Sequence, residues 1–434
     1  MFMRKNVTQV CLVALLAVTI ARGQAQPNST AITHVTVVDV IAGTTRPDMT
    51  VLITGNLISQ IVPSSQMSPP AGTHNIDGRG EFLIPGLWDM HVHLGNATEA
   101  ALPVLLASGI TGVRDMGSPS FETLRRWRIE ALKGERIGPR IVAPGPILTM
   151  GAPYFWERVV HNPDEGRKAV DMLVESGVDF IKITQSLDRE TYFAIADEAR
   201  ILDIPFVGHL PVNDNGIGYK VSGIEASNAG QKCFEHGQGV PLPVEPKDPD
   251  LIPTLLKNHT WVDPTIITYW SRAHIQELSS EQNDPRLKHI APGFKQFWDS
   301  QLSQYPKNNK IPLMVLQWRM EQIPMLQKAG VPLLAGTDLG FAYIYPGDLI
   351  KELEFFVQAG LTPLEALRTA TINPARFLNK EKELGSVEAG KVADLVLLDS
   401  NPLDDIHNLR AIRAVVFNGK LFDRAKLDAI LPTF

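Results

Sequence analysis

The stretch LIPGLWDMHVHLG, residues 83–95, decides the fold. It begins as an apolar strand with a Pro-Gly turn and ends with His91 and His93, two residues apart. Successive side chains in a strand alternate between its two faces, so these two imidazoles are expected to point the same way. A His-x-His pair at the end of a strand therefore predicts one point at which both rings converge.

Length and composition describe a globular protein. The chain has 434 residues, and 44% of them are hydrophobic, which is enough to bury a large core. This length favours one large domain with a smaller one over a single compact unit. The formal net charge is -6, and no run of like charges offers a basic surface. Nucleic acid is therefore not an expected partner.

Residues 1–25 are predicted to be a signal peptide. Arg4 and Lys5 precede an apolar run over residues 10–20, and small residues follow. This run suits a secretory signal, whereas a membrane-spanning helix needs about 20 apolar residues. The mature chain is then exported, periplasmic or extracellular, with no stable membrane span; the alternative is an uncleaved anchor. Cys11 would leave with the signal, so only Cys233 would remain.

Two β-like segments flank the chain. Residues 26–84 are rich in Val, Ile and Thr at strand-like spacing, with a turn signal at Asp77-Gly78. Residues 385–434 contain the similar runs KVADLVLLD and IRAVVFNGK. The two segments are predicted to pair into one small β-sandwich domain built from both chain ends.

The middle of the chain, residues 85–384, alternates short apolar strands with amphipathic helical stretches. This is the pattern of repeated βα units around a parallel sheet. Eight strand candidates follow in order: GLWDMHVHL, GITGVRDMG, RIVAPGPIL, VDFIKIT, IPFVGHL, KCFEHG, TWVDPTII and VPLLAGTD. They predict an α/β fold, a (β/α)8 TIM barrel, with its active site at the carboxyl ends of the strands.

Polar residues of the metal-ligand type stand at these strand ends: His91, His93, Lys182, His209, His236 and Asp338. All six would lie at the same end of one barrel. Each has a structural alternative, because a lone His in an apolar strand can be a hydrogen-bonded core residue and Asp338 can cap the following helix. The other seven histidines are expected to be surface or structural residues: His34, His74, His161, His259, His274, His289 and His407.

Lys182 fits a purely structural role least well. An ammonium that faces a barrel interior costs several kcal/mol unless it is paired or neutralised. A neutral amine can instead add carbon dioxide and become a carbamate, an anion able to bridge two cations. The alternative is a salt bridge from Lys182 to Asp338 or Asp179.

The order of these residues resembles that of the binuclear amidohydrolase superfamily. The segments FLIPGLWDMHVHL, GHLP, FEHG, AGTD and GKVADLVLLDSNP are similar to motifs of its imidazolonepropionase-like branch. That branch contains exported hydrolases of Xaa-Pro and Xaa-Arg dipeptides and related N-acyl amino acids. The resemblance covers nearly the whole predicted mature chain.

The resemblance implies two divalent metal ions, with zinc as the default. His91, His93 and Asp338 would bind one ion. His209 and His236 would bind the other, and carboxylated Lys182 would bridge the pair. Dipeptide-cleaving relatives often have a Tyr shortly after the sixth-strand His, where this chain has Gln238. The missing Tyr argues against the dipeptidase assignment. It does not argue against the expected metal centre.

The expected function is hydrolysis of an amide bond in a small molecule, of the dipeptide or N-acyl amino acid type. A metal-bridged hydroxide would attack the carbonyl, with Asp338 as general base and then general acid. The alternative is a cyclic amide, lactone, carbamate or phosphotriester at the same site. Deamination is disfavoured because the fifth strand reads GHLP rather than His-x-x-Glu. A non-catalytic binding protein is disfavoured because all six ligand positions are filled.

The substrate side of the predicted site is less defined. Tyr154, Phe155 and Trp156 follow the third strand, and a helical insertion over residues 271–330 carries Trp298 and Trp318. These aromatic side chains either form a lid and an apolar pocket or pack the insertion onto the barrel. Two further residues could meet a substrate carboxylate or carbonyl, namely Arg114 and Tyr269. The sequence leaves a homo-oligomer open.

Overall fold

The computed structural model describes residues 29–118, 120–151, 157–213, 218–241, 248–281, 283–306, 310–341 and 343–434. The predicted signal peptide and the aromatic run over residues 154–156 lie outside the described residues. None of the described helices is both long enough and apolar enough to cross a bilayer.

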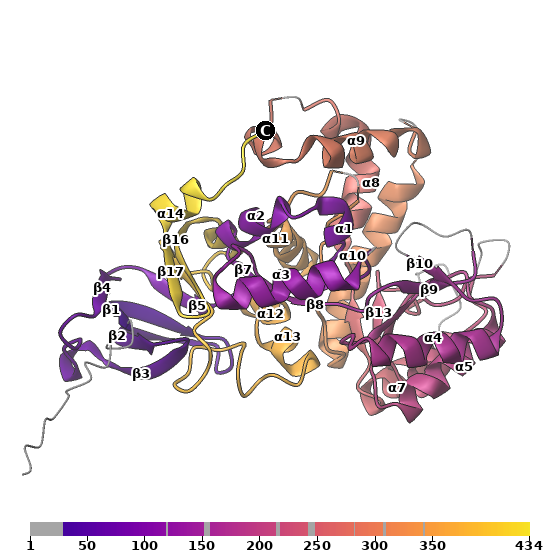
Figure 1. The fold of residues 1–434 in the computed structure, drawn as a ribbon, viewed down its shortest axis with the longest axis horizontal. Helices are drawn as coiled ribbons and strands as arrows, with labels where there is room; N and C mark the ends of the chain where they lie inside the picture. Colours follow the sequence, from indigo (N-terminus) through magenta and orange to yellow (C-terminus); the bar gives the residue numbers. More distant parts are fainter. Residues whose placement is uncertain are drawn as a thin grey trace, which may run out of the picture.

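Strands from both chain ends share one eight-stranded sheet, whose order is β17-β16-β15-β5-β1-β2-β3, with β4 on β1. Its strands are β1 (Ser29–Asp39), β2 (Thr44–Thr54), β3 (Leu57–Pro63), β4 (His74–Asp77), β5 (Phe82–Pro85), β15 (Leu395–Leu398), β16 (Ile412–Phe417) and β17 (Lys420–Asp423). The antiparallel pair β5–β15 joins the two ends, as the indigo and yellow ribbons show (Figure 1).

The side chains of β15 show why this sheet lies between two cores. Leu395 and Leu397 pack into a small cluster within the β-rich region, whereas Val396 and Leu398 face the main core. Such burial on both faces explains the continuous apolar run LVLL. Strands of the two chain ends thus pair within a single hydrogen-bonded sheet, as the sequence predicts. The two-sheet sandwich stays a prediction.

The remaining strands form two parallel sheets. One has the order β6-β7-β8 and the other the order β10-β9-β11-β12-β13-β14. Their strands are β6 (Leu87–Val92), β7 (Ile110–Asp115), β8 (Arg140–Val142), β9 (Ile147–Thr149), β10 (Glu157–Val159), β11 (Ile181–Ile183), β12 (Phe206–Gly208), β13 (Gln231–Glu235) and β14 (Trp261–Asp263). Seven of the eight predicted strands therefore occur where the sequence indicated, the third in two pieces.

The third predicted strand is broken because Pro144 and Pro146 lack backbone donors and Gly145 adopts a positive φ of 71°. Its first half, β8, pairs with β7, and its second half, β9, pairs with β11. The bend thus connects the two parallel sheets. At the same place the amide of Asp179 donates to the carbonyl of Ala143 over 3.0 Å.

The eighth predicted strand forms no regular strand, but residues 332–339 lie between β14 and β6. The amide of Leu334 donates to Val262 of β14 over 3.0 Å, and the amide of Met90 in β6 donates to Ala335 over 2.9 Å. Gly336 permits this close approach, since a Cβ there would lie 2.4 Å from the Cβ of His91.

Helices surround the parallel strands (Figure 1). They are α1 (Leu94–Ala97), α2 (Ala101–Ala107), α3 (Phe121–Lys133), α4 (Pro163–Glu175), α5 (Arg189–Ile201), α6 (Gly223–Asn228), α7 (Leu251–Lys257), α8 (Ile266–Leu278), α9 (Pro292–Ser300), α10 (Ile311–Ala329), α11 (Leu349–Ala359), α12 (Pro363–Thr369), α13 (Ile372–Phe377) and α14 (Arg424–Ala429). Four 3-10 helices are η1 (Ser64–Gln66), η2 (Pro285–His289), η3 (Leu302–Gln304) and η4 (Ile406–Arg410). The predicted helical insertion corresponds to the end of α8, α9 and α10.

Local sequence explains the individual helices, as α4 illustrates. The side chain of Asn162 accepts from the amide of Glu165, and Pro163 occupies the first turn, where no amide donor is needed. Ala169, Val170 and Leu173 then recur at helical spacing and are buried. Its amphipathic pattern thus fixes which face covers the sheet.

An apolar cluster collects side chains from strand after strand. It contains Trp88 and Met90 from β6, Val207 from β12, Cys233 from β13, and also Met116, Phe180 and Leu334. Phe377 of α13 packs on the same cluster. The residues two positions further along several of these strands are polar, and they build the site described next.

Candidate metal centre

Strand alternation carries polar side chains to a common cavity. Lys182 stands two residues after Phe180, and His209 stands two residues after Val207, so each shares a face with a residue of the apolar cluster. The cavity has a volume of about 370 Å³. Five of the six predicted ligands line it: His93, Lys182, His209, His236 and Asp338.

The sixth predicted ligand, His91, is buried beside the others. Its ring centroid lies 4.7 Å from that of His236 and 5.5 Å from that of His93. The rings of His209 and His236 are 5.0 Å apart. His91, His236 and Asp338 offer ligand atoms that all lie within 4.8 Å of one another. All six residues selected from the sequence are therefore brought together.

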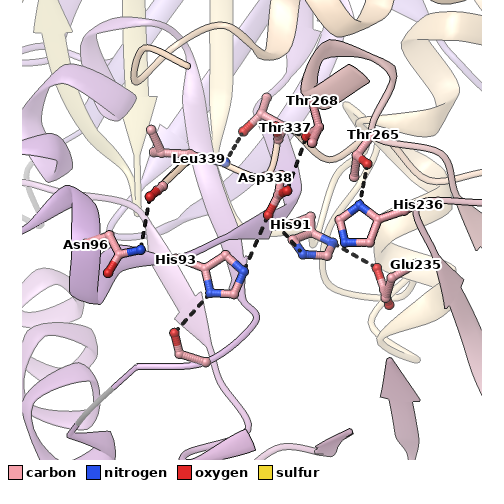
Figure 2. Close-up of polar contacts among 12 residues, drawn as sticks. His91, His93, Asn96, Glu235, His236, Thr265, Thr268, Thr337, Asp338 and Leu339 are labelled. Atoms are coloured by element: carbon pink, nitrogen blue, oxygen red, sulfur yellow. Dashed lines mark hydrogen bonds and ion pairs between the residues drawn. The ribbon is translucent and has the colours of Figure 1, made fainter. Parts of the chain in front are cut away.

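Asp338 lies between the side chains of His93 and of His91 and His236 (Figure 2). Its Oδ1 lies 3.5 Å from Nε2 of His91 and 3.4 Å from Nε2 of His93, while its Oδ2 accepts from the hydroxyl of Thr268. Its φ is +61°, a left-handed conformation that turns the carboxylate inward, and its amide donates to the carbonyl of His91. The nearest downstream helix, α11, begins only after the N-cap position Asp348, so the alternative role of Asp338 as a helix cap is wrong.

Three of the four histidines are oriented through Nδ1. Nδ1 of His91 lies 3.0 Å from Oε2 of Glu235, and Nδ1 of His93 lies 3.2 Å from the carbonyl oxygen of Gly117. Nδ1 of His236 lies 2.7 Å from the hydroxyl of Thr265. With Nδ1 occupied, Nε2 is the atom that each ring can offer to a ligand (Figure 2). Metal-binding histidines usually have this second hydrogen bond.

Several buried polar atoms of the site make no hydrogen bond to any residue that the structure describes. They are Nε2 of His91, both ring nitrogens of His209, Nζ of Lys182 and Oδ1 of Asp338. Buried polar groups without partners are rare in folded proteins. Burial and the nearby Lys182 also hold the pKa values of His91 and His209 well below the usual range, so these rings are neutral. Neutral imidazoles with a carboxylate fit a divalent metal ion.

Lys182 is buried and forms no ion pair with a described residue. Asp179, one of the two partners considered for it, binds Arg128 instead. Burial is the main cause that lowers the pKa of Lys182 to about 8. A side chain with this pKa is mostly charged at pH 7 and about half neutral near pH 8, and the neutral amine is the state that can react with carbon dioxide.

Comparison with known proteins agrees with this geometry. The sequence pattern of the amidohydrolase family matches residues 82–422. The chain belongs to the amidohydrolase family. It is accordingly a hydrolase that acts on carbon–nitrogen bonds, and the resemblance seen in the sequence is confirmed. Members of this family are generally metal-dependent, as the donor set of the site suggests.

Among individual proteins, ochratoxinase of Aspergillus niger is 24% identical over 417 residues, which cover 83% of this chain and 79% of the relative. Imidazolonepropionase of Thermoplasma volcanium is 34% identical over 103 residues, or 23% of this chain and 25% of the relative. A crystal structure from Bifidobacterium longum, assigned as a prolidase, has 28% identity and a TM-score of 0.72, covering 93% of this chain and 98% of the other.

A buried ionic group that the sequence did not reveal lies beneath the candidate metal site of this amidohydrolase. Nη2 of Arg114 donates to Glu235 (2.9 Å) and to Asp263 (3.2 Å), and Glu235 in turn holds His91. All three side chains are completely buried. The proposed contact between Arg114 and a substrate is therefore wrong, because its guanidinium is engaged beneath the site. The sequence offered one sign of this buried group, namely that Glu235 directly precedes the predicted ligand His236.

The open side of the cavity in this amidohydrolase has few aromatic groups among the described residues. Tyr269 lines it and donates its hydroxyl proton to the carbonyl of His236, and Phe341 packs edge-on against His93. The predicted pocket residues Trp298 and Trp318 do not line it. Trp298 is buried against other aromatic rings of the insertion, so it serves packing.

Polar groups complete the lining. Gln238, at the place where relatives have a Tyr, contributes its amide, and its oxygen accepts from the backbone of Leu210. Thr149, Thr184 and Ser186 form a cluster of mutually hydrogen-bonded hydroxyls. Sequence reasoning missed these three residues because isolated Ser and Thr residues carry no distinctive pattern.

Proposed function

We propose that this amidohydrolase is a metal-dependent enzyme that cleaves the amide bond of an N-acyl amino acid or a dipeptide. The observation that carries this proposal is the convergence of six ligand-type side chains, with unpartnered buried atoms, beside a cavity of about 370 Å³. Such a volume suits a small molecule. The similarity to a structure assigned as a prolidase and to ochratoxinase favours an amide substrate.

Two divalent ions, zinc in the first instance, are assigned to the site. His91, His93 and Asp338 would hold one ion, and His209 and His236 the other. Lys182 would bridge both as its carbamate. When bound, such ions polarise a carbonyl and lower the pKa of water to about 7.

Asp338 is the proposed general base and general acid. Its carboxylate would take a proton from the attacking water and deliver it to the leaving amine. The hydroxyl of Thr268 fixes one carboxylate oxygen, which leaves Oδ1 directed at the histidines. The neighbouring Thr337 is anchored through its hydroxyl and amide to Asp89, so the turn that carries Asp338 is held rigidly.

The wider architecture is proposed as follows. The parallel strands and residues 332–339 would close into a (β/α)8 barrel over residues 85–384. The hydrogen bonds at both junctions between the parallel sheets support closure. Residues 26–84 and 385–434 would form the small β domain. Export, with loss of residues 1–25, would place the enzyme in the periplasm or outside the cell.

The first test combines metal content with a substrate panel. Protein purified without chelators is expected to contain about two divalent ions per chain. The panel would hold N-acetyl-L-phenylalanine, N-acetyl-L-methionine and L-methionyl-L-proline, together with a hydantoin, a lactone and a neutral phosphotriester. Hydrolysis of the first group, lost with a chelator and restored by zinc, supports the proposal. Activity on the second group alone, or no bound metal, contradicts it.

The carbamate has a separate test at Lys182. The Lys182→Ala variant is expected to lose one or both metal ions, and added short carboxylic acids should restore part of the activity by replacing the missing anion. Labelled bicarbonate should introduce a carbonyl carbon detectable by NMR in the native protein only. Full metal content and normal activity in the variant would refute the carbamate.

A further inference from the structure

One cation of the cavity has no assigned role. Arg272 lines the cavity, and within the described part of the chain its guanidinium makes no ion pair or hydrogen bond. The nearby Arg114 and Arg319 differ from it. Arg114 binds two buried carboxylates, and Arg319 donates to the carbonyl of Gly237 over 2.6 Å. Among the residues that the structure describes, Arg272 is thus the arginine of the cavity without a partner of its own.

Helix α8 fixes where Arg272 lies. Residues three apart on a helix are neighbours on one face, so Arg272 stands next to Tyr269. The hydroxyl of Tyr269 donates to the backbone of His236 and ties this face of α8 to the metal centre. Arg272 lines the same cavity as His209 and His236, so its side chain faces the space beside these two rings.

We propose that Arg272 binds the free carboxylate of the substrate and thereby restricts this amidohydrolase to N-acyl amino acids and dipeptides with an unblocked C-terminus. This proposal rests on the proposed function. A guanidinium pairs with a carboxylate through two parallel hydrogen bonds, which gives orientation as well as attraction. The scissile amide of such a substrate is separated from its carboxylate by a single Cα, so the anchor must lie close to the metal centre.

The lining around Arg272 is mixed, with the carboxylate of Glu157, several hydroxyls and apolar side chains. Thr149, Thr184 and Ser186 line the same cavity with hydroxyls that hydrogen-bond to one another, while Phe341 and Ile147 provide apolar surface for a side chain. A neutral phosphotriester or lactone would leave the guanidinium without a partner. Loss of such a charge-assisted contact commonly weakens recognition more than loss of an apolar contact does.

The test compares a substrate with its carboxamide. The N-acyl amino acid or dipeptide hydrolysed fastest in the panel would be measured beside the same compound with a C-terminal amide, using the zinc-loaded full-length enzyme. In the wild type, kcat/KM should favour the free acid by at least about 100-fold. Arg272→Met should remove this preference, mainly through KM of the acid, and leave the amide almost unchanged. Arg272→Lys should retain part of it.

Controls separate anchoring from other effects. Lys295→Met removes a partly exposed cation of α9 outside the cavity and should leave the hydrolysis of both substrates unaffected. Metal content should be the same in all variants. Equal losses for acid and amide in Arg272→Met, or a loss in kcat with KM unchanged, would overturn the proposal.

A binding measurement keeps the proposal testable if no panel compound is hydrolysed, the outcome that refutes the proposed function itself. Calorimetry would compare 3-phenylpropionate with uncharged 3-phenylpropanol on the zinc-loaded protein. Arg272→Met should weaken binding of the acid at least about 10-fold and leave the alcohol unaffected. Because the metal sites are identical in both proteins, unchanged affinity for the acid would exclude Arg272 as the anchor.

Discussion

The side chains on one face of the parallel strands form two layers, an apolar cluster and the candidate site. Residues of the two layers stand only two positions apart in the sequence. In the lower layer Phe180 and Val207 pack against apolar neighbours. In the upper layer, two residues further along the chain in each case, Lys182 is equally buried and His209 is partly exposed, and buried nitrogens of both lack hydrogen-bond partners among the described residues. Neighbouring positions of the same segments thus form an apolar core with satisfied contacts and a site whose polar atoms lack partners.

The comparison of the two layers indicates which residues stabilise the fold and which are available for chemistry. Each unsatisfied buried polar group costs about 1–3 kcal/mol. The unpartnered polar groups of the upper layer therefore lower the stability of the metal-free fold. The apolar contacts of the lower layer must offset this cost in free energy. A ligand that completes the coordination of these atoms removes the cost. Substitutions in the upper layer should change chemistry more than stability, and substitutions in the lower layer should do the reverse.

The largest effect is expected in the upper layer, at Asp338. Asp338→Asn retains the shape of the side chain and its bond to Thr268 but cannot take up a proton at the reaction pH. The turnover number should fall by about 10²–10⁴, the usual contribution of a general acid–base group. Steady-state kinetics at saturating zinc measures it, and circular dichroism should show an intact fold. Near-normal turnover would refute the assigned role.

Thr268→Val provides the matched comparison. It removes a hydrogen bond from the same carboxylate without removing its basicity. Its turnover should fall far less than that of Asp338→Asn. Equal losses in the two variants would indicate that orientation of the carboxylate, rather than proton transfer, limits the rate.

The next effect sharpens the contrast between the two layers at Lys182 of β11 and at Phe180, directly before this strand. Phe180→Ala should destabilise the protein by about 3–5 kcal/mol, because it opens a cavity in the apolar cluster. Lys182→Met should leave the metal-free protein as stable as the wild type or more stable by up to about 2 kcal/mol, since it removes an unpaired buried amine. Urea denaturation of metal-free protein measures both. A larger loss for Lys182→Met than for Phe180→Ala would contradict the two-layer description.

The upper layer was predictable from the sequence because its residues stand at fixed offsets from apolar strands. His91 and His93 share a strand end, and Lys182 and His209 follow recognisable apolar runs. The order of the strands was predictable for the same reason. The break in the third strand was not foreseen, although Pro144 and Pro146 mark it.

The supporting contacts were not predictable, because they join residues distant in the sequence. Arg114 is separated from Glu235 by 121 residues and from Asp263 by 149 residues. An arginine near a strand end fits a substrate contact and a buried ion pair equally well, so only the three-dimensional arrangement distinguishes them. The same holds for Arg272, whose availability depends on what surrounds its helix.

The smallest effect concerns the group between the two layers, where Glu235 contacts both Arg114 and His91. Glu235→Gln removes the negative charge that orients His91, and loss of such a contact typically weakens metal binding about 10–100-fold. Zinc affinity would be measured by competition with a chromogenic chelator. Asp263→Asn is the matched control, because it also neutralises a partner of Arg114 but leaves the hydrogen bond to His91 intact. Both variants should lose stability, since each weakens the compensation of a buried guanidinium. Equal losses of zinc affinity would mean that the charge of the buried group acts on the metal site as a whole, and that the contact to His91 has no special role.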